Sequence, residues 1–301
     1  MAELLDGKAT AKAIRTELKR EIKALRERAA RPPQSVFIQV GEDPASTLYV
    51  DMKHKLAGRM GVESRIERYP AELSQAELLS RIAALNADPG VHGILVQVPL
   101  PAQIDEQAVV LALDPRKDVD CFHPENVGRM MIGLPGPRPA TPQGVLMLLD
   151  AYGIALKGAN VTMLGRSNLV GRPLGIMLLH RHATVTYCHT RTRDLAAECR
   201  RADVLIAAAG KARLVTGAMV KPGAVVVDVG TNHEPLLDEA GQPVLDDEGQ
   251  PKQKLVGDVV FDEVEPLASY ISPVPGGVGP MTIASVLSNV VTCYKAQEQL
   301  D

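Results

Sequence analysis

The sequence predicts an α/β protein built from two domains. Its 301 residues exceed the size at which one hydrophobic core usually stops growing, so two domains of about 100 to 200 residues are expected. Helix-period segments alternate with short β-branched segments, a pattern typical of a mostly parallel sheet. Aromatic residues make up only 3% of the chain and Trp is absent. Burial must therefore rest on Ala, Val, Ile and Leu, which favours α/β over a β-sandwich.

The N-terminal half alternates helices and strands. Apolar residues at three- and four-residue steps from Ala11 to Leu25 predict an amphipathic helix over 7–30, ended by the pair Pro32-Pro33. A capping box at Ser74-Gln75-Ala76-Glu77 opens a later helix. The other predicted elements here are the strand 35–40, the helix 46–60, the strand 63–68 and the buried strand 93–97. This βαβα order predicts a mostly parallel sheet.

A second α/β unit is predicted beyond the Gly/Pro-rich stretch 128–144, which is the best candidate for a passage between domains. Its predicted elements are the strand 160–164, the helix 173–182, the strand 184–187, the helix 194–201 and the strands 203–208 and 224–229. They make a compact doubly wound sheet. Residues 236–254 are predicted to form a solvated hairpin or loop insertion.

The last apolar helix, from about Met281 to Gln299, follows the irregular segment SPVPGGVGP. We expect this helix to return to the first domain, so that two chain crossings form a hinge and the cleft between the domains is the active site. The expected domains are therefore 1–139, completed by the helix 280–301, and 140–279.

Bulk properties exclude several classes of function. The net charge is −3 with charges of both signs interspersed, which indicates neither nucleic-acid binding nor a polybasic membrane patch. The charged N-terminus is unlike a signal peptide, and no apolar run approaches the length of a membrane span. Four cysteines without CxxC spacing are typical of reduced, intracellular thiols. The protein is expected to be cytoplasmic.

The segment from Val161 to Gly175 joins a hydrophobic strand to a helix through glycines at 165, 171 and 175. Free N–H groups at a helix N-terminus suit a cofactor pyrophosphate, although an ordinary Gly-rich turn explains the pattern equally well. The second strand ends in CHTRTRD, which supplies Thr190, Arg191 and Arg193 before any acid, and Arg166 lies in the first turn. These cations favour NADP over NAD. Asp194 leaves NAD open, but its position also fits a helix N-cap.

Polar residues of the first half are candidates for chemistry. Tyr49 and Lys53 lie four residues apart on a predicted helix and share a face, although most helical lysines are solvated charges. Gln97 ends a buried parallel strand, at the edge where α/β sheets bind ligands. Asp118 and Asp120 follow another helix, where a single aspartate is usually a turn cap.

Six motifs in order along nearly the whole chain resemble those of the methylenetetrahydrofolate dehydrogenase/cyclohydrolase family, the FolD type. They are YVDMKHK, GILVQVPLP, KDVDCFHPENVG, TPQG, GRSNLVGRP and PVPGGVGPMT. The resemblance implies an N-terminal α/β substrate domain, a Rossmann-type NADP-binding domain and a homodimer. It also implies NADP-dependent oxidation of 5,10-methylenetetrahydrofolate, followed by hydrolysis of the methenyl product to 10-formyltetrahydrofolate.

The resemblance also implies roles for individual residues. Lys53 matches the catalytic lysine, Tyr49 its partner beside the folate ring, Gln97 its hydrogen-bonding neighbour, and Asp120 the pterin-binding carboxylate. The cofactor side matches at Gly165, Arg166 and Ser167 in the first turn, at Thr190 near the 2′-phosphate, and at Thr231 beside the nicotinamide, while Arg193 is a candidate from its charge after the second strand. The substrate-lining loop matches at Pro275, Gly276 and Gly277, within Pro275 to Gly279.

The chain departs from the family pattern at two positions. Cys121 replaces the glycine of DVDG and is expected to narrow the pocket, to require a negative φ, or simply to be a small buried thiol. Ala140 replaces the cysteine of PCTP. His123 is interpreted as a hydrogen-bonding scaffold residue, and His180 and His182 lack companions at ligand spacing, so no metal is expected.

Three other functions stay possible from sequence. A member of the same fold with only the dehydrogenase or only the cyclohydrolase activity is disfavoured because Lys53, Gln97 and Arg166 are all present. A nonenzymatic nucleotide-binding module does not need the set of Tyr49, Lys53, Gln97 and Asp120. Dehydrogenases of amino acids or hydroxy acids with a similar cleft do not need DVDxFHP beside PVPGGVGPMT.

Overall fold

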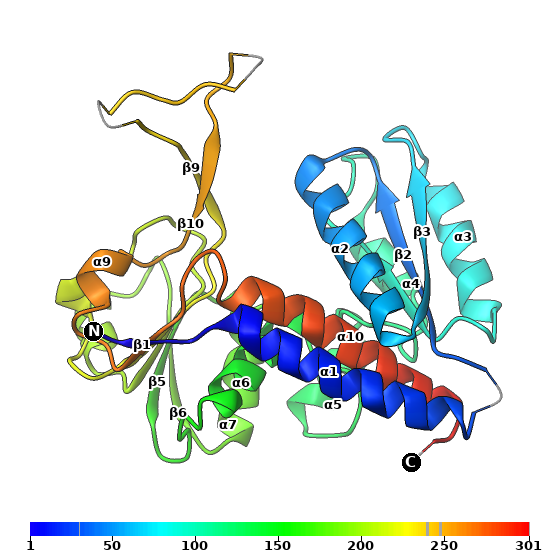
Figure 1. Ribbon diagram of the computed structural model, residues 1–301, viewed down its shortest axis with the longest axis horizontal. Helices are drawn as coiled ribbons and strands as arrows, with labels where there is room; N and C mark the ends of the chain where they lie inside the picture. Colours follow the sequence, from blue (N-terminus) through cyan, green and yellow to red (C-terminus); the bar gives the residue numbers. More distant parts are fainter. Residues whose placement is uncertain (30, 239–240, 247–248, 301) are drawn as a thin grey trace. The chain divides into compact units, whose positions relative to one another are not determined.

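The computed structural model describes residues 1–29, 31–238, 241–246 and 249–300, and the chain divides into two compact units (Figure 1). Unit 1 contains Met1–Thr10 and Gly144–Met281, and unit 2 contains Ala11–Gln143 and the residues from Thr282 onward. Both units are α/β, which confirms the predicted fold class. Ala30, at the end of the first predicted helix, lies outside the described residues.

Unit 2 is built on a three-stranded parallel sheet in the order β3-β2-β4. The strands are β2 (Gln34–Val40), β3 (Glu63–Tyr69) and β4 (Gly93–Val96). Each lies within one residue of its prediction. The short β-branched runs were sufficient to locate them because both faces of this sheet are covered, as is usual for parallel strands.

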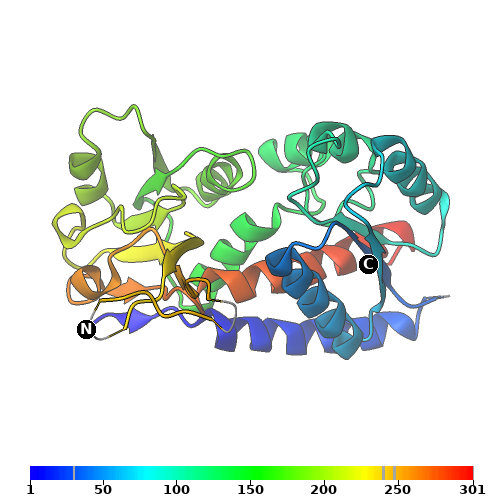
Figure 2. The same ribbon diagram turned by 90° about the horizontal axis from the view of Figure 1, so that it is seen from above.

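Successive residues of these strands point to opposite faces and contact different helices. Phe37 and Leu95 belong to a core shared with α1 (Gly7–Arg26), α2 (Pro44–Met60) and α10 (Val278–Gln297). Ile38 and Ile94 belong to a second core, shared with α3 (Gln75–Ala87) and α4 (Glu106–Ala112). The two layers of helices are visible in Figure 1, and Figure 2 shows α1 and α10 side by side.

The C-terminal helix packs in unit 2, as the sequence predicted. From Thr282 onward α10 belongs to this unit, where Val286, Leu287 and Val290 lie in the core with Leu18 and Ile22 of α1. The helix begins at Val278, three residues earlier than expected, since glycine and proline are tolerated in a first helical turn.

Local capping explains where the helices of unit 2 begin and end. The predicted capping box is confirmed, because the Ser74 hydroxyl accepts from Glu77 N–H at 3.3 Å and the Glu77 carboxylate accepts from Ser74 N–H at 3.0 Å. Asp43 caps α2 by accepting from Ser46 N–H at 2.7 Å. Gly61 ends the same helix with a left-handed φ of 92°, where a glycine avoids strain.

Two helices occupy much of the Gly/Pro-rich stretch that was predicted to be a passage. They are α5 (Pro124–Met131) and α6 (Ala140–Ala151). Pro124 sits in the first turn of α5, where proline is compatible with a helix. The chain leaves unit 2 after Gln143, inside α6, and Ala140 is buried in the unit 2 core.

Unit 1 contains a six-stranded parallel sheet in the order β1-β11-β8-β7-β5-β6. The strands are β1 (Glu3–Leu4), β5 (Asn160–Leu164), β6 (Thr184–Cys188), β7 (Val204–Ala207), β8 (Val225–Asp228) and β11 (Tyr270–Ile271). The helices α7 (Gly171–His180), α8 (Leu195–Arg200) and α9 (Phe261–Val264), with the 3₁₀ turn η1 (Gly217–Met219), connect them. This is the predicted Rossmann-type arrangement.

The first ten residues differ from their expected placement. They cluster with unit 1, where Glu3 of β1 pairs with Tyr270 of β11. The chain therefore passes between the units within α1, α6 and α10, rather than at the two crossings expected. A two-residue strand has no alternation to recognise, so sequence patterning misses it.

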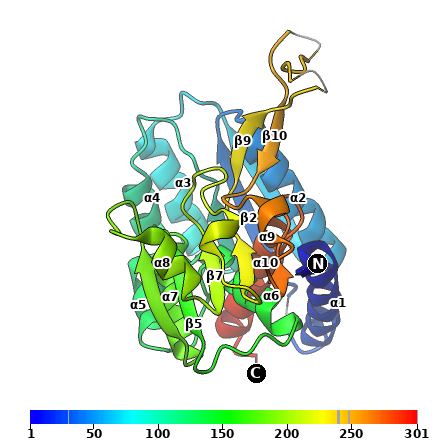
Figure 3. The ribbon, with the colours of Figure 1, turned by 90° about the vertical axis from the view of Figure 1, so that its left-hand side faces the viewer.

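A hairpin projects from the sheet of unit 1, as Figures 1 and 3 show. It is formed by β9 (Asn232–Pro235) and β10 (Gln253–Val256), which pair antiparallel. Most of residues 236–254, which were predicted to form a hairpin or a loop insertion, lie between these two strands. Residues 239–240 and 247–248 of this stretch lie outside the described residues. Among the helices that the structure describes, none is both long and apolar enough to cross a bilayer.

Lys117 stabilises unit 2 from a buried position directly before the Asp-Val-Asp motif. Its side chain is 4% exposed, and Nζ donates to the carbonyls of Leu85, Asn86 and Asp88 at 3.0, 2.8 and 2.7 Å. These carbonyls lie at the end of α3, where helical partners are lacking.

We expect Lys117→Met to lower the free energy of unfolding by about 3 kcal/mol, because it leaves buried carbonyls without donors. Urea denaturation followed by circular dichroism measures this loss. Lys55→Met, at an exposed position of α2, is the matched control and should change stability little. Equal stability of the two variants would show that the three hydrogen bonds contribute nothing.

Candidate active site

Lys53 is buried, unlike most helical lysines. It lies on the inward face of α2 with Val50 and Ala57, and its side chain is only 6% exposed. Its Nζ donates to Gln97 Oε1 at 2.9 Å. A buried amine with a fixed acceptor at the end of a parallel strand is a candidate catalytic group rather than a solvent-exposed surface charge.

Gln97 is held firmly enough to orient that amine. Its backbone N–H continues the ladder of β4 by donating to Ile38 O at 2.8 Å. Its side-chain Nε2 donates to Val98 O at 2.6 Å, so that Oε1 is turned toward Lys53. The predicted partnership of Gln97 with Lys53 is thus present in the geometry.

Tyr49 lies one helical turn before Lys53. Its ring is half-buried and packs against the core formed by α1, α2 and α10. Among the described residues, none makes a hydrogen bond with its hydroxyl. The ring is therefore anchored while the hydroxyl stays available to a ligand.

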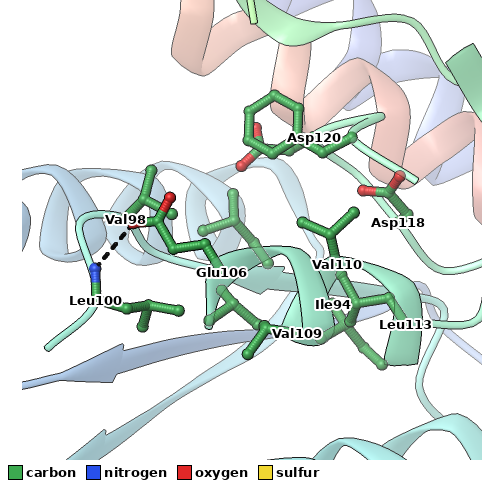
Figure 4. Close-up of a pocket in the computed structure, with 12 residues that line it drawn as sticks. Ile94, Val98, Leu100, Glu106, Val109, Val110, Leu113, Asp118 and Asp120 are labelled. Atoms are coloured by element: carbon green, nitrogen blue, oxygen red, sulfur yellow. Dashed lines mark hydrogen bonds between the residues drawn. The ribbon is translucent and has the colours of Figure 1, made fainter. Parts of the chain in front are cut away.

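The two aspartates of the Asp-Val-Asp motif have different environments. Asp118 is buried and accepts from Cys121 N–H at 2.9 Å, His123 N–H at 2.8 Å and Asn126 Nδ2 at 3.2 Å, so it is a turn cap. Asp120 is half-buried, and no described residue donates a hydrogen bond to it. Figure 4 shows both carboxylates above the apolar side chains of β4 and α4.

Charge couples Asp120 to Lys53. Burial lowers the pKa of the Lys53 amine, and the negative charge of Asp120 acts in the opposite direction. Burial raises the pKa of Asp120 to about 6, against the effect of Lys53, while Asp118 adds to the rise. The site therefore holds a lysine that gives up its proton more easily than usual and a carboxyl that ionises in the neutral range.

Cys121 takes a backbone conformation that was not expected of it. Its φ is +60°, so the expected negative φ is wrong. The bond from its N–H to Asp118 and the bond from its thiol to Pro137 O at 3.3 Å hold it in this left-handed geometry. The thiol is fully buried, and burial raises its pKa, which confirms the interpretation as a small buried thiol.

His123 has a structural position. Its Nδ1 accepts from Glu125 N–H at 3.2 Å and caps α5, which confirms the interpretation as a scaffold residue. Within the described residues, no group of three or more His, Cys, Asp or Glu side chains is placed to hold a metal ion.

A small cavity of about 20 Å³ adjoins the two aspartates, which is room for about one water molecule. Val98, Val109 and Leu113 are among the apolar residues that line it. Leu100 N–H donates to Glu106 Oε1 at 3.2 Å at its rim, as Figure 4 shows. Its apolar walls explain why burial dominates the pKa of Asp120.

In unit 1, the turn after β5 is packed too closely for side chains. Gly165 has a φ of +109°, and a Cβ there would meet Ala208 O at 2.0 Å. A Cβ at Gly171 would meet Gly165 O at 2.3 Å, and one at Gly175 would meet the Tyr187 hydroxyl at 2.0 Å. These glycines let the turn close tightly and let α7 pack against β6, the roles expected in a dinucleotide fold.

The same turn has free donors for a phosphate. Ser167 Oγ accepts from the N–H groups of Val170 at 3.1 Å and Gly171 at 3.4 Å. The consecutive N–H groups from Arg166 to Leu169 donate to no residue in the part of the chain that the structure describes. Unpaired N–H groups before a helix fit a pyrophosphate, so the residues present fit NADP.

The turn after β6 presents cations beside that donor set, since β5 and β6 are neighbours. Thr190, Arg191 and Arg193 are exposed, and no ion pair joins either arginine to a described residue. Asp194 instead caps α8 by accepting from Ala197 N–H at 2.9 Å. Its role as an N-cap removes the main argument for NAD.

Unit 1 also contains the other predicted contacts. Thr231 is exposed in the turn after β8. Pro275, Gly276 and Gly277 follow β11, where Gly276 O accepts from Lys8 N–H at 3.2 Å. Two buried carboxylates near Thr231, those of Asp228 and Asp258, were not predicted from sequence. Asp228 ends a fully apolar strand run, which is the signal that identifies it.

Two family models match consecutive parts of the chain. The catalytic domain of tetrahydrofolate dehydrogenase/cyclohydrolase matches residues 5–120, and the NAD(P)-binding domain of the same enzymes matches residues 139–298. The bifunctional protein FolD of Moorella thermoacetica is 51% identical over 290 residues, 96% of this chain and 98% of the relative. That of Geobacillus thermodenitrificans is 50% identical over 96% of both chains.

Solved structures agree with these matches. The FolD dehydrogenase/cyclohydrolase of Campylobacter jejuni is 44% identical with a TM-score of 0.89, over 98% of this chain and 99% of that one. The Trypanosoma brucei enzyme, solved with NADP cofactor and an inhibitor, is 39% identical with a TM-score of 0.88 over 98% of both chains. This chain therefore belongs to the tetrahydrofolate dehydrogenase/cyclohydrolase family.

Proposed function

We propose that this protein is bifunctional: it oxidises 5,10-methylenetetrahydrofolate with NADP and hydrolyses the resulting methenyl compound to 10-formyltetrahydrofolate. Unit 2 supplies the reacting groups, and unit 1 binds NADP. The observation that carries this proposal is the buried Lys53, held by Gln97 and coupled to Asp120. Family models for both the catalytic and the cofactor domain support the two activities together.

The first step requires orientation more than proton transfer. Bound NADP would supply the acceptor for a hydride from the methylene carbon, which would leave the cationic methenyl bridge. No proton moves, so the protein contributes by fixing the folate in place. Tyr49 supplies an anchored ring surface, and Asp120 supplies an acceptor for the adjacent ring N–H and amino groups of the pterin.

The second step requires proton transfers. Water adds to the cationic carbon and releases a proton, which a neutral Lys53 amine accepts. The hydroxyl of this adduct then loses its own proton as the formyl C=O forms, the bond from the carbon to N5 breaks, N5 takes a proton, and the formyl group stays on N10. The reaction releases one proton overall. The lowered pKa of Lys53 suits this exchange, and Gln97 keeps the amine in place in both protonation states.

The loop Pro275, Gly276 and Gly277 is proposed to line the folate. On the cofactor side, Gly165, Arg166 and Ser167 are proposed to bind the pyrophosphate region, Thr190 and Arg193 the 2′-phosphate, and Thr231 the nicotinamide end. A cytoplasmic location and a homodimer are proposed from the family resemblance.

A member of the family with only one activity is the alternative. It is disfavoured because the Lys53 arrangement and the free donors after β5 occur in one chain. A nonenzymatic nucleotide-binding module or a dehydrogenase acting on another substrate does not need the Lys53, Gln97 and Asp120 arrangement.

The test is turnover of purified protein on 5,10-methylenetetrahydrofolate with NADP, following reduced cofactor and the methenyl compound separately by absorbance. Formation of both reduced NADP and 10-formyltetrahydrofolate is expected. A protein that reduces NADP but leaves added methenyl substrate intact has the dehydrogenase activity alone. Failure of both reactions would refute the proposed function.

The cations after β6 should set the cofactor preference. We expect Arg193→Ser to lower kcat/KM with NADP by about tenfold to a hundredfold, because a charge-assisted bond to the 2′-phosphate contributes about 1.5 to 3 kcal/mol. Turnover with NAD, which lacks that phosphate, should change little. Arg201→Ser, at the far end of α8, is the matched control. An equal loss with NAD and NADP would place Arg193 outside the phosphate site.

A further inference from the structure

Asp258 is a fully buried carboxylate that accepts hydrogen bonds from the backbone that follows a neighbouring strand. Its Oδ2 accepts from the N–H groups of Ala209 at 2.6 Å and Gly210 at 3.0 Å, and its Oδ1 accepts from Lys211 N–H at 2.9 Å. Those residues form the turn after β7. Asn232 Nδ2 donates to the same Oδ1 at 2.9 Å, which ties the start of the hairpin to that turn.

Asp228, the last residue of β8, binds Asp258 in turn. Its Oδ1 accepts from the N–H groups of Asp258 and Gly230, both at 2.9 Å, and its Oδ2 accepts from Val259 N–H at 2.9 Å. Asp228 N–H itself donates to Ser272 Oγ at 2.7 Å. The two carboxylates therefore bind the backbone that follows β7 and β8 into one network.

Two glycines show how closely this network is packed. A Cβ at Gly257 would lie 1.8 Å from Asp228 Oδ2, and one at Gly230 would lie 2.4 Å from Asp258 N. The carboxylates are thus enclosed by backbone on several sides. Such an enclosure fixes positions more strictly than a solvated ion pair does.

The turns joined in this way lie at one edge of the sheet. Strands β8, β7 and β5 are adjacent, with Asp228 opposite Ala207 and Ala207 opposite Leu164. The Gly165 turn extends the network, because it packs directly on Ala208 O. Carboxyl ends of neighbouring parallel strands form the ligand-binding edge of this fold.

We propose that Asp258, supported by Asp228, is a positioning residue for the cofactor: it fixes the turn 209–211 and the segment carrying Thr231 against the nicotinamide half of NADP. Thr231 is held on both sides, since Gly230 bonds to Asp228 and Asn232 bonds to Asp258. This inference rests on the proposed function for the identity of the cofactor.

The test is Asp258→Asn, which keeps the size of the side chain but turns one acceptor into a donor facing backbone N–H groups. We expect the Kd of NADPH, measured by its fluorescence, and the KM for NADP to rise by about tenfold or more. Hydrolysis of added methenyl substrate should keep its kcat, because Lys53, Gln97 and Asp120 belong to the other unit. If Asp258 only stabilised the fold, cofactor binding and hydrolysis would be impaired together.

Two further variants keep the test decisive. Asn232→Ala removes only one of the four donors to Asp258 and should raise the KM for NADP by a smaller factor. If Asp258→Asn does not fold, this variant tests the proposed role of Asp258 in its place. Asp203→Asn is the matched control, since Asp203 accepts from Asn160 N–H at 2.9 Å at the opposite edge of the same sheet. It should leave NADP binding unchanged.

Wild-type affinity for NADPH in both Asp258→Asn and Asn232→Ala would overturn the proposal. So would a parallel loss of cofactor binding and hydrolysis in folded variants. Because NADPH binding is measured without turnover, a wild type that binds NADPH but does not convert folate would refute the proposed function while still testing the role of Asp258.

Discussion

Replacing Lys53 with Met is expected to slow hydrolysis of the methenyl substrate by about 10²- to 10⁴-fold, the usual contribution of a positioned acid or base. Methionine fills the buried space and removes only the amine that bonds to Gln97. Oxidation of the methylene substrate should fall much less, because hydride transfer moves no proton. The variant should therefore release the methenyl compound instead of 10-formyltetrahydrofolate.

The pH dependence of hydrolysis should identify the form of Lys53 that acts. Burial lowers the pKa of its amine, so the neutral form becomes available at a lower pH than for a solvated lysine. The wild-type rate should rise with pH until it passes that lowered pKa and then level off. Lys53→Arg, which stays protonated, should lose hydrolysis as severely as Lys53→Met.

Separate assays of the two steps, each started from its own substrate, measure these effects. Lys55→Met tests whether the loss of any lysine from α2 has the same result, and it should retain both activities. Hydrolysis at the wild-type rate in Lys53→Met would exclude Lys53 as the proton acceptor and direct attention to a water held by other groups.

The main strands and helices could be predicted from sequence because their patterns are local. Alternation, capping boxes and Gly or Pro boundaries identified β2, α3 and β5 to within a few residues. The strand β1 was not predicted, because two residues are too few to show a periodicity. The start of helix α6 was not predicted, because its first turn contains a proline. Proline usually indicates a helix break, although it is tolerated in a first turn.

For the candidate site too, local sequence patterns identified residues, whereas the contacts between distant residues required the structure. Motif resemblance selected Lys53, Gln97 and Asp120, but only the fold shows that Lys53 is buried and bonded to Gln97, a contact between residues 44 positions apart. Asp258 was missed for the same reason. Its four donors come from Ala209 to Lys211 and from Asn232, and no local pattern connects these segments.

Removing the carboxylate of Asp120 should weaken folate binding in both reactions. We expect Asp120→Ala to raise the KM for the methylene and the methenyl substrates by about a hundredfold or more, because it removes two proposed hydrogen bonds to a charged carboxylate, each worth about 1.5 to 3 kcal/mol. NADPH binding should not change, since the cofactor residues belong to unit 1. Steady-state kinetics with each folate and a fluorescence titration with NADPH measure the two effects.

The raised pKa of Asp120 adds a pH signature to this prediction. The ionised carboxylate is the form that accepts from the pterin, and burial raises its pKa to about 6 in the free protein. As pH falls through that value, the ionised fraction falls and kcat/KM for the folate should fall with it, about tenfold per unit well below the pKa. In Asp120→Asn this dependence should disappear.

The effect of Asp120 on stability should have the opposite pH dependence: its contribution to the free energy of unfolding should fall as pH rises. A carboxyl whose pKa is higher in the folded than in the unfolded chain contributes stability at low pH, and this contribution is lost as pH rises through about 6. Asp120→Asn should therefore be at least as stable as the wild type at neutral pH, so a loss of folate binding in this variant would not come from unfolding. Asp51→Asn, at an exposed position of α2, controls for a change of charge. An unchanged folate KM in Asp120→Ala, with only kcat reduced, would mean that Asp120 acts on the reaction through Lys53 rather than by binding the pterin.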